Sequence, residues 1–291
     1  MSNNKKDVDQ FSGIETTGHE WDGIRELNNP LPRWWLLTFY ACIVFAIGYT
    51  IVYPAWPGLT GNTKGLWGWS SRGDIENTMA DVANSRKALE DKIGASQISA
   101  IMADPEMKAF AVSAGASNFK VHCAACHGSG AQGAAGYPNL NDDDWLWGSS
   151  PDQIVATIGH GVRSPVDKDT HQSQMPAFGK DGVLDDAKIA AVTQYVLKLA
   201  KLDHDEGKAT AGQQIFTDNC AACHGDNGEG KIEMGAPKLA DQIWLYKGSA
   251  DGIAAQVANP RHGVMPAWEP QLGAVKVKEL AAYVISLGGS K

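Results

Sequence analysis

The stretch CAACH at Cys123–His127 decides the fold, and the same five letters recur at Cys220–His224. Two thiols one helical turn apart can form two thioether bonds to a haem, and the histidine that follows at once can bind the haem iron. The sequence therefore predicts two covalently bound haem c groups, with His127 and His224 as axial iron ligands. The attaching cysteines are Cys123, Cys126, Cys220 and Cys223.

A Cys-x-x-Cys pair alone is also half of a zinc site, or the redox pair of a thioredoxin-like protein. A zinc site needs a second pair of ligands at matching spacing, and a thioredoxin-like motif lies in a βαβ pattern without an obligatory histidine after it. Neither context surrounds the two motifs. Haem attachment is therefore the favoured interpretation, with structural zinc or a disulfide as the alternatives.

The composition excludes few protein classes. The chain has 291 residues and a formal net charge of -8, which allows one to three small domains with their own cores. Without a basic excess we expect no nucleic-acid binding, and we interpret the scattered acidic residues as a solvated surface rather than a docking site for a basic partner. The fifth cysteine, Cys42, lies in an apolar run and is expected to act as a small hydrophobic residue.

An uncharged run of nineteen residues, 34–52, comes close to the ~20 residues that a helix needs to cross a bilayer. Tryptophans and tyrosines flank the run at both ends, as in the aromatic belts of membrane proteins. A cleaved signal peptide would have a shorter apolar core and a cleavage site of small residues, which YPAWP at residues 53–57 does not provide. We therefore predict one uncleaved membrane span at residues 34–56.

The charges around this span indicate its orientation. Four lysines and arginines precede it, against Lys64 and Arg72 soon after it, which favours a cytoplasmic N-terminus. The haem motifs favour the same orientation, because c-type haems are attached on the outer face of the bacterial inner membrane. We predict a single-pass protein of that membrane, with residues 1–33 as a polar cytoplasmic tail and the haem domains in the periplasm. The four preceding cations are Lys5, Lys6, Arg25 and Arg33.

Residues 57–105 are interpreted as a periplasmic linker. Residues 57–73 read as an irregular connection, and Asp74 is a good N-cap for an amphipathic helix that follows. Its apolar stripe can pack on the chain's own first domain or lie on another subunit, and both alternatives stay open. A shorter helix is expected at Ile98–Phe110, interrupted at Asp104-Pro105. The stripe consists of Ile75, Met79, Val82, Leu89 and Ile93.

Two copies of one pattern follow, the second motif beginning 97 residues after the first. Each copy has a phenylalanine four residues before its first cysteine, a Pro-x-Leu and a Trp-Leu after the motif, a Met-Pro-Ala-aromatic run, and a closing apolar-periodic helix. The closing helices are expected at Asp185–Leu199 and Val275–Leu287. The pattern predicts an all-α chain with two tandem haem domains, 106–204 and 205–291, joined by a linker near 201–208.

Each iron needs a sixth ligand, and a thioether in that position raises the reduction potential relative to a second imidazole. Met175 and Met265 occupy the same Met-Pro-Ala-aromatic slot of the two copies, so we predict that they are the distal axial ligands. Ligation within each domain is the simpler assumption, and exchange of the two methionines between the domains stays open. The competing ligands are His160 and His171 in the first copy and Met234 and His262 in the second.

Several residues near the motifs are candidates for supporting roles. We expect the Pro-x-Leu runs at 138–140 and 237–239 to line the haem edge and to hold the proximal imidazole through a backbone carbonyl. Trp145 and Trp244 are expected to pack on the porphyrin or in the core. Arg163 and Arg261 could pair with haem propionates, although an exposed arginine is more often only solvated.

The two haem motifs with MPAF at 175–178 and MPAW at 265–268 resemble class I cytochrome c domains over residues ~106–291. The N-terminal part narrows the resemblance. WDGIRELNNPLPRWW at residues 21–35, the span, YPAWP and then GWSSRG at residues 68–73 are similar to FixP/CcoP, the di-haem subunit III family of cbb3-type cytochrome c oxidases.

The resemblance implies a function in electron transfer. In that family the subunit takes electrons from a donor cytochrome c and passes them to the mono-haem subunit, from which they reach the catalytic subunit, where oxygen is reduced and protons are pumped. It implies the ligand set given above, and no enzyme activity of this chain on its own, since a span without histidines cannot house an oxygen-reducing centre. Two alternatives are a di-haem subunit of a dehydrogenase or another reductase, and a haem sensor or metal-binding module without electron transfer.

Overall fold

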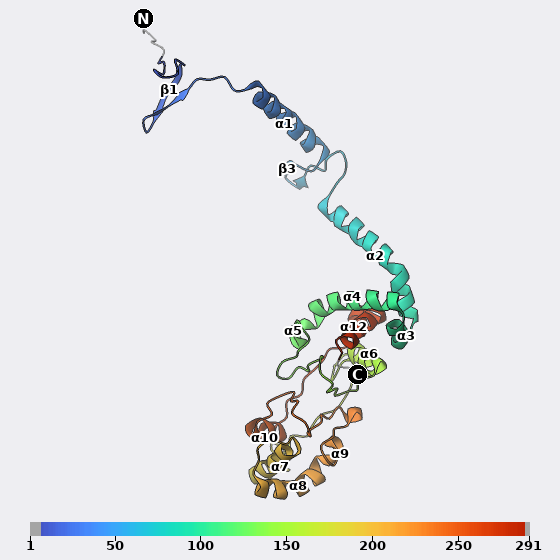
Figure 1. Cartoon of the computed structure of the whole chain (residues 1–291). Coiled ribbons are helices and arrows are strands. Elements are labelled where there is room, and N and C mark those ends of the chain that lie inside the picture. The colour runs from blue at the N-terminus through green and yellow to red at the C-terminus, as the bar shows by residue number, and fades with distance from the viewer. Residues whose placement is uncertain (1–6, 289–291) are drawn as a thin grey trace. The chain divides into compact units, whose positions relative to one another are not determined.

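The computed structural model describes residues 7–288, and its contacts divide the chain into two units, Met1–Asn84 and Ser85–Lys291 (Figure 1). Two of the cations used in the orientation argument, Lys5 and Lys6, and the last residues of the predicted second haem domain, 289–291, lie outside the described residues.

A β-hairpin precedes the apolar helix, where the sequence predicted only a polar tail. Strand β1, Thr16–Trp21, pairs antiparallel with β2, Ile24–Leu27. Asp22 and Gly23 connect the strands with φ angles of 50° and 83°, and this left-handed pair is the backbone that a tight hairpin turn requires. The Asp-Gly dipeptide is a known signal for such a turn, but the hairpin was not predicted from it.

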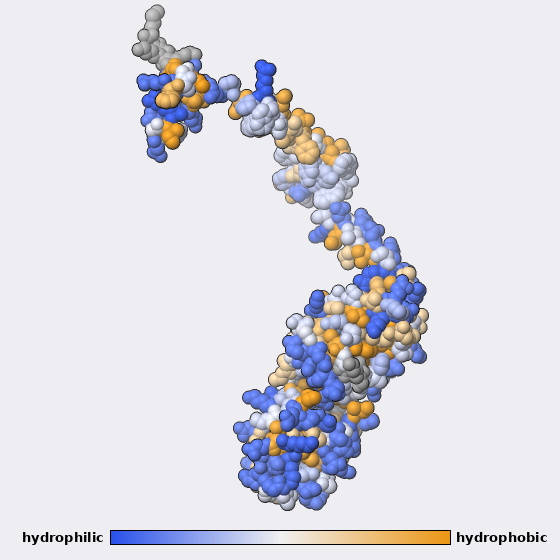
Figure 2. All heavy atoms as spheres, viewed as in Figure 1, coloured by the Kyte–Doolittle hydropathy of each residue, from blue (hydrophilic) through white to orange (hydrophobic). Residues whose placement is uncertain are grey.

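Helix α1, Arg33–Val52, is long and apolar enough to cross a membrane, and none of its residues is buried. Hydrophobic side chains lie on its surface in Figure 2. It begins one residue before the predicted span of 34–56 and ends four residues before the predicted end. Behind it, a small hairpin of β3, Pro57–Gly58, and β4, Gly61–Asn62, replaces part of the irregular connection that we expected.

Helix α2, Ser71–Ala95, begins three residues before the predicted N-cap. Its early apolar residues Ile75, Met79 and Val82 are exposed, whereas Ile93 in its last turn is fully buried. Of the two alternatives for the stripe, packing on the chain's own core therefore holds for its C-terminal end.

The regular elements described in the second unit are helices joined by loops, in agreement with the predicted all-α fold. Asp104 ends one helix and caps the next, because its carboxylate accepts hydrogen bonds from the backbone N–H groups of Glu106 and Met107. The elements are α3 Ile98–Ala103, α4 Pro105–His122, α5 Ala124–His127, α6 Pro151–His160, α7 Asp186–Leu199, α8 Glu206–Asn219, α9 Ala221–His224, η1 Ile232–Met234, α10 Ala250–Ala258, α11 Glu269–Leu272 and α12 Ala274–Ser286.

The closing helix of each sequence copy packs against the other copy. Helix α12 from the second copy lies along α4, which leads into the first haem motif, and α7 from the first copy lies along α8, which leads into the second (Figure 1). A glycine marks each crossing: a Cβ on Gly115 would lie 2.1 Å from the carbonyl oxygen of Glu279, and one on Gly212 would lie 2.1 Å from that of Ala191. The packing thus differs from the expectation that each copy closes on its own helix.

The repeated aromatic residues pair in the same crosswise way. Phe119 contacts Tyr283 with ring centroids 5.2 Å apart and 55° between the planes, and Phe216 contacts Tyr195 at 5.2 Å and 56°. Both phenylalanines are almost completely buried. The two cores are therefore equivalent, and each combines residues of both sequence copies.

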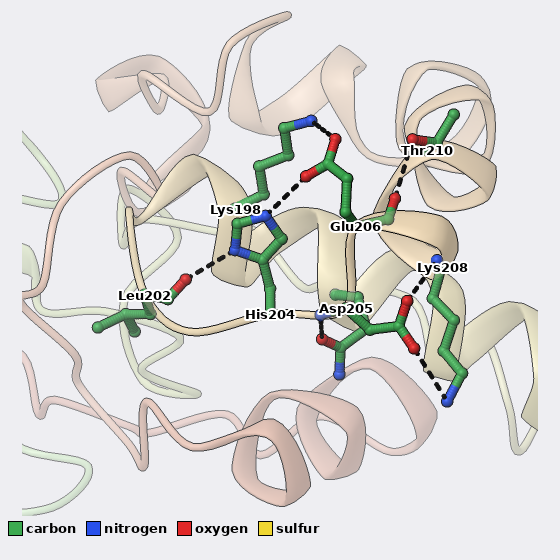
Figure 3. A network of polar contacts seen from close by, with 8 residues as sticks. Lys198, Leu202, His204, Asp205, Glu206, Lys208 and Thr210 are labelled. Carbon is green, nitrogen blue, oxygen red and sulfur yellow. Dashed lines mark hydrogen bonds and ion pairs between the residues drawn. The ribbon is translucent and has the colours of Figure 1, made fainter.

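A short ordered connection explains why α7 pairs with α8 (Figure 3). Only residues 200–205 separate these helices, and helices joined by so short a loop pack as antiparallel neighbours. The Nδ1 atom of His204 donates to the Leu202 carbonyl, and its Nε2 atom lies 3.0 Å from the Glu206 carboxylate, which also accepts a hydrogen bond from Lys198. The expected linker near 201–208 is thus a tight turn, and it leaves α4 to be covered by the last helix.

Glu279 of α12 is a buried carboxylate between α2, α4 and its own helix. Its side chain is 0% exposed, Arg86 lies 3.6 Å away and Asn118 donates a hydrogen bond of 3.3 Å. Burial raises the pKa of Glu279 to about 7, and the nearby Glu90 raises it further, while Arg86 and Lys276 oppose the rise. Below about pH 7 the folded protein therefore holds this carboxyl group mainly in its protonated form.

We expect Glu279→Gln to remove a pH dependence of stability. Because the folded pKa lies above the unfolded one, the stabilisation is present at acidic pH and is lost as the pH rises through about 7. At pH 8 the variant should exceed the native protein by roughly 2–3 kcal/mol in free energy of unfolding, since one pKa unit corresponds to about 1.4 kcal/mol. Denaturant unfolding followed by circular dichroism at pH 5 and 8 measures this, with the exposed Glu106→Gln as control. Equal pH profiles of native protein and Glu279→Gln would contradict the assignment.

Candidate functional site

Each CAACH motif forms one tight helical turn at the end of a longer helix. In the first, Cys123 caps the C-terminus of α4 and its carbonyl accepts from the backbone N–H groups of Cys126 and His127 at 3.1 and 2.9 Å. The second motif repeats these bonds at Cys220 with the same distances. This turn brings two thiols and one imidazole to one end of the helix, the arrangement that covalent haem attachment requires.

The two motif histidines are held in one tautomer by backbone carbonyls. The Nδ1 atom of His127 lies 3.0 Å from the Pro138 oxygen, and that of His224 lies 2.9 Å from the Pro237 oxygen. A carbonyl oxygen can only accept, so Nδ1 carries the proton and Nε2 keeps a free lone pair. These contacts confirm the predicted role of the two Pro-x-Leu runs.

The electrostatics of the motifs favour neutral side chains. Burial lowers the pKa of His127 and of His224, although the proline carbonyls partly oppose this, so both imidazoles are neutral at pH 7. Burial also raises the pKa of Cys123 and Cys220 to about 11, with a further contribution from the second cysteine of each motif. Both thiols are therefore protonated at pH 7 while nothing is bound to them.

The residues around the motifs do not supply further zinc ligands. In the described part of the chain, the cluster of three potential metal-binding side chains consists of His160, Asp167 and Asp169, and it includes no motif cysteine. The four motif cysteines are free thiols and form no disulfide. The two alternatives to haem attachment therefore find no support in the geometry.

A cavity opens beside the first motif, and both sequence copies line it. His127 and both cysteines form one side, and Met265 and Trp268 from the second copy take part in the wall. The lining is mainly apolar and includes a neutral imidazole that could bind an iron, which together fit a haem. Other lining residues are Phe119, Tyr137, Leu140, Trp145, Trp147, Ile154, Ile158, Val162, Leu280 and Val284.

The second motif has the corresponding surroundings from the first copy. Cys220 and Ala221 belong to a buried cluster with α7, and Met175 packs against that cluster. His224 is 8% exposed. Met175 thus lies on the side of the second motif and Met265 on the side of the first, so of the two arrangements left open, the packing favours exchanged methionines.

The competing ligands make other contacts. His171 stacks on Trp147 with centroids 4.3 Å apart, and its Nε2 lies 3.0 Å from the Thr157 hydroxyl. The Nδ1 atom of His160 lies 3.0 Å from the Asp167 carboxylate. In the second copy Met234 is exposed, and His262 is not among the residues that line the first cavity. The two histidines of the first copy thus have partners of their own, while Met175 and Met265 pack against the two cores.

The supporting residues are placed partly as expected. Trp145 packs against the first core and Trp244 against the second. Arg261 lies over the ring of Tyr246, 4.3 Å from its centroid, on the surface. Arg163 lines the first cavity and donates to two backbone carbonyls, and no sequence pattern predicted these two contacts.

Sequence reasoning also missed the cavity residues that come from the other copy. Trp268, Leu280 and Val284 lie in the second copy and line the first cavity. The repeat pattern marks these positions as core residues, but it cannot tell which of two equivalent cores they enter. The six-residue connection between α7 and α8 is the feature that decides between the two cores.

Comparisons with known proteins agree with this geometry. Residues 13–60 match the family described as the N-terminal domain of cytochrome oxidase-cbb3, FixP. Residues 110–196 and 207–284 match the family described as cytochrome c oxidase, cbb3-type, subunit III. The chain belongs to the FixP/CcoP family of cbb3-type oxidase subunits.

Relatives in this family match over nearly their whole length. The FixPc subunit of Rhizobium leguminosarum bv. viciae is 56% identical over 285 residues, 98% of this chain and 99% of the relative. The FixP subunit of Sinorhizobium medicae is 52% identical over 291 residues, all of both chains. The CcoP subunit of Cereibacter sphaeroides is 47% identical over 276 residues, 95% of each. The resemblance to FixP/CcoP predicted from the sequence is confirmed.

Proposed function

We propose that this chain is the membrane-anchored di-haem electron-transfer subunit of a cbb3-type cytochrome c oxidase. The observation that carries the proposal is the pair of equivalent CAACH turns, each with a neutral histidine fixed by a proline carbonyl and a methionine packed against the same core. Each haem, when bound, supplies a one-electron redox centre. The chain's own residues attach, orient and bury the two haems.

The proposed ligand sets are crossed between the two copies. Cys123 and Cys126 attach the first haem, with His127 and Met265 as its axial ligands. The second haem has His224 and Met175, and Cys220 and Cys223 attach it. The boundaries 106–204 and 205–291 then delimit sequence copies, while each haem domain in space takes its closing helix and its methionine from the other copy.

The proposed division of labour leaves oxygen reduction to another chain. Electrons enter from a donor cytochrome c, pass through the two haems and leave for the mono-haem subunit, which supplies the catalytic subunit that reduces oxygen and pumps protons. The protein has no catalytic residues of its own in this proposal, because its polar groups at the haem sites fix ligands rather than face a substrate. Helix α1 anchors the chain in the bacterial inner membrane, with the β1–β2 hairpin in the cytoplasm and the haem domains in the periplasm.

Purification from membranes tests this function. We expect the full chain to resist extraction by high salt, to be extracted by detergent together with a larger haem-containing complex, and to contain two haem c groups per chain in a pyridine haemochrome assay. Mass spectrometry of the co-purifying chains identifies the client. A chain that purifies alone, or with a dehydrogenase, would refute the oxidase assignment, and release by salt would refute the anchor.

A further inference from the structure

One arginine side chain is hydrogen-bonded to both of the segments that carry the candidate distal methionines. The Nε atom of Arg163 donates to the carbonyl oxygen of Gly263 at 2.6 Å, and its Nη1 atom donates to that of Ser173 at 2.9 Å. Gly263 lies two residues before Met265, and Ser173 lies two residues before Met175. A single guanidinium therefore joins equivalent points of two segments that are far apart in the sequence.

The backbone around Arg163 lies between the same two segments. Val162 and Met265 exchange both of their backbone hydrogen bonds, at 3.0 and 2.9 Å, and the N–H of Arg163 donates to the carbonyl of His171 at 2.8 Å. A Cβ on Gly161 would lie 2.3 Å from the Met265 carbonyl oxygen, so the chains approach as closely as only glycine allows. Main chain and side chain thus act on the same pair of segments.

The charge of Arg163 strengthens these contacts. The side chain is half-buried at the first cavity, and among the described residues no carboxylate lies within ion-pair distance of it, so the two carbonyls are its protein partners. Hydrogen bonds from a charged donor are about twice as strong as neutral ones. Its φ of 54° lies in the left-handed region, which a residue with a side chain adopts only where its surroundings hold it.

We propose that Arg163 is a positioning residue for both distal methionines, so that one side chain couples the axial ligation of the two haems. The proposal rests on the His/Met ligation proposed above and adds to it a shared support. Without the guanidinium, Gly263 and Ser173 lose their common donor, and both Met-Pro segments can move away from the irons together. A residue acting on one site alone would affect one haem.

The test is Arg163→Gln in the full chain, purified in its complex. We expect two covalent haems to remain, the absorption band of thioether-ligated ferric haem to weaken, and both midpoint potentials to fall. The affinity of both ferric haems for added imidazole should rise by about tenfold or more, because a hydrogen bond from a charged group contributes at least that factor to an equilibrium. Arg261→Gln is the matched control and should change none of these, because Arg261 lies four residues before Met265 but its side chain contacts Gln256 and Tyr246.

Arg163→Lys separates the contacts from the charge. Lysine keeps the charge but presents its donors from one nitrogen, so it cannot reach two carbonyls along the directions of Nε and Nη1. We expect Arg163→Lys to resemble Arg163→Gln in its affinity for imidazole. If the glutamine variant binds fewer than two haems, the lysine variant takes its place in the test. The inference is overturned if the Arg163 variants change the imidazole affinity and midpoint potential of one haem only, or of neither. If the unmodified protein itself lacks the thioether band, the His/Met ligation fails instead.

Discussion

Replacing Cys220 and Cys223 with serine is expected to leave one covalent haem per chain instead of the two that we propose for the native protein. Serine cannot form the thioether bonds, and His224 alone does not retain a haem through denaturing electrophoresis. Haem-stained gels and intact mass measure the loss directly. Replacing Cys123 and Cys126 should have the same effect on the other haem, whereas Cys42→Ser in α1 should leave both haems in place.

The crossed packing adds a second expected result for the Cys220/Cys223 variant. Helices α7 and α8 cover the second site, so loss of that haem should increase hydrogen exchange in α7, Asp186–Leu199, which belongs to the first sequence copy. Helix α12 should keep its protection, because it packs on α4 beside the first haem. A variant that still carries two haems, or one that loses protection in α12 instead, would contradict this arrangement.

The sequence was sufficient for the local chemistry of the sites. A CAACH motif needs one helical turn, and a Pro-x-Leu run shortly after it places a carbonyl beside the histidine, so spacing alone predicted the contacts of His127 and His224. The apolar run before Tyr53 likewise predicted α1, because length and lack of charge decide whether a helix can span a bilayer. These features depend on residues close together in the chain.

The partnership between helices could not be predicted in the same way. The two copies have the same apolar pattern, so α7 fits either α4 or α8, and pattern alone does not distinguish two equivalent cores. The loop length decides it, since the six residues 200–205 hold α7 beside α8. The contacts of Arg163 follow from this crossing, because Gly263 and Ser173 meet only where the exchanged segments pass each other.

Met265→His is expected to lower the midpoint potential of the haem attached through Cys123 and Cys126, not that of the haem in its own sequence copy. Met265 packs on the first core, and a second imidazole stabilises ferric haem relative to a thioether. The expected fall is on the order of 100 mV or more, a fraction of the roughly 0.8 V range that axial ligands cover. Met175→His should act in the same way on the other haem.

Single-haem variants assign each shift to its haem. In a chain whose Cys220 and Cys223 are serines, Met265→His should still lower the one remaining potential, and Met175→His should leave it unchanged, as redox titration will show. Met234 is exposed, so Met234→His is the matched control in this single-haem chain and in the chain with both haem motifs. If Met175→His shifts the first haem instead, each methionine serves its own copy. The crossed contacts of α7 and α12 would then stabilise the fold without determining which methionine binds which iron.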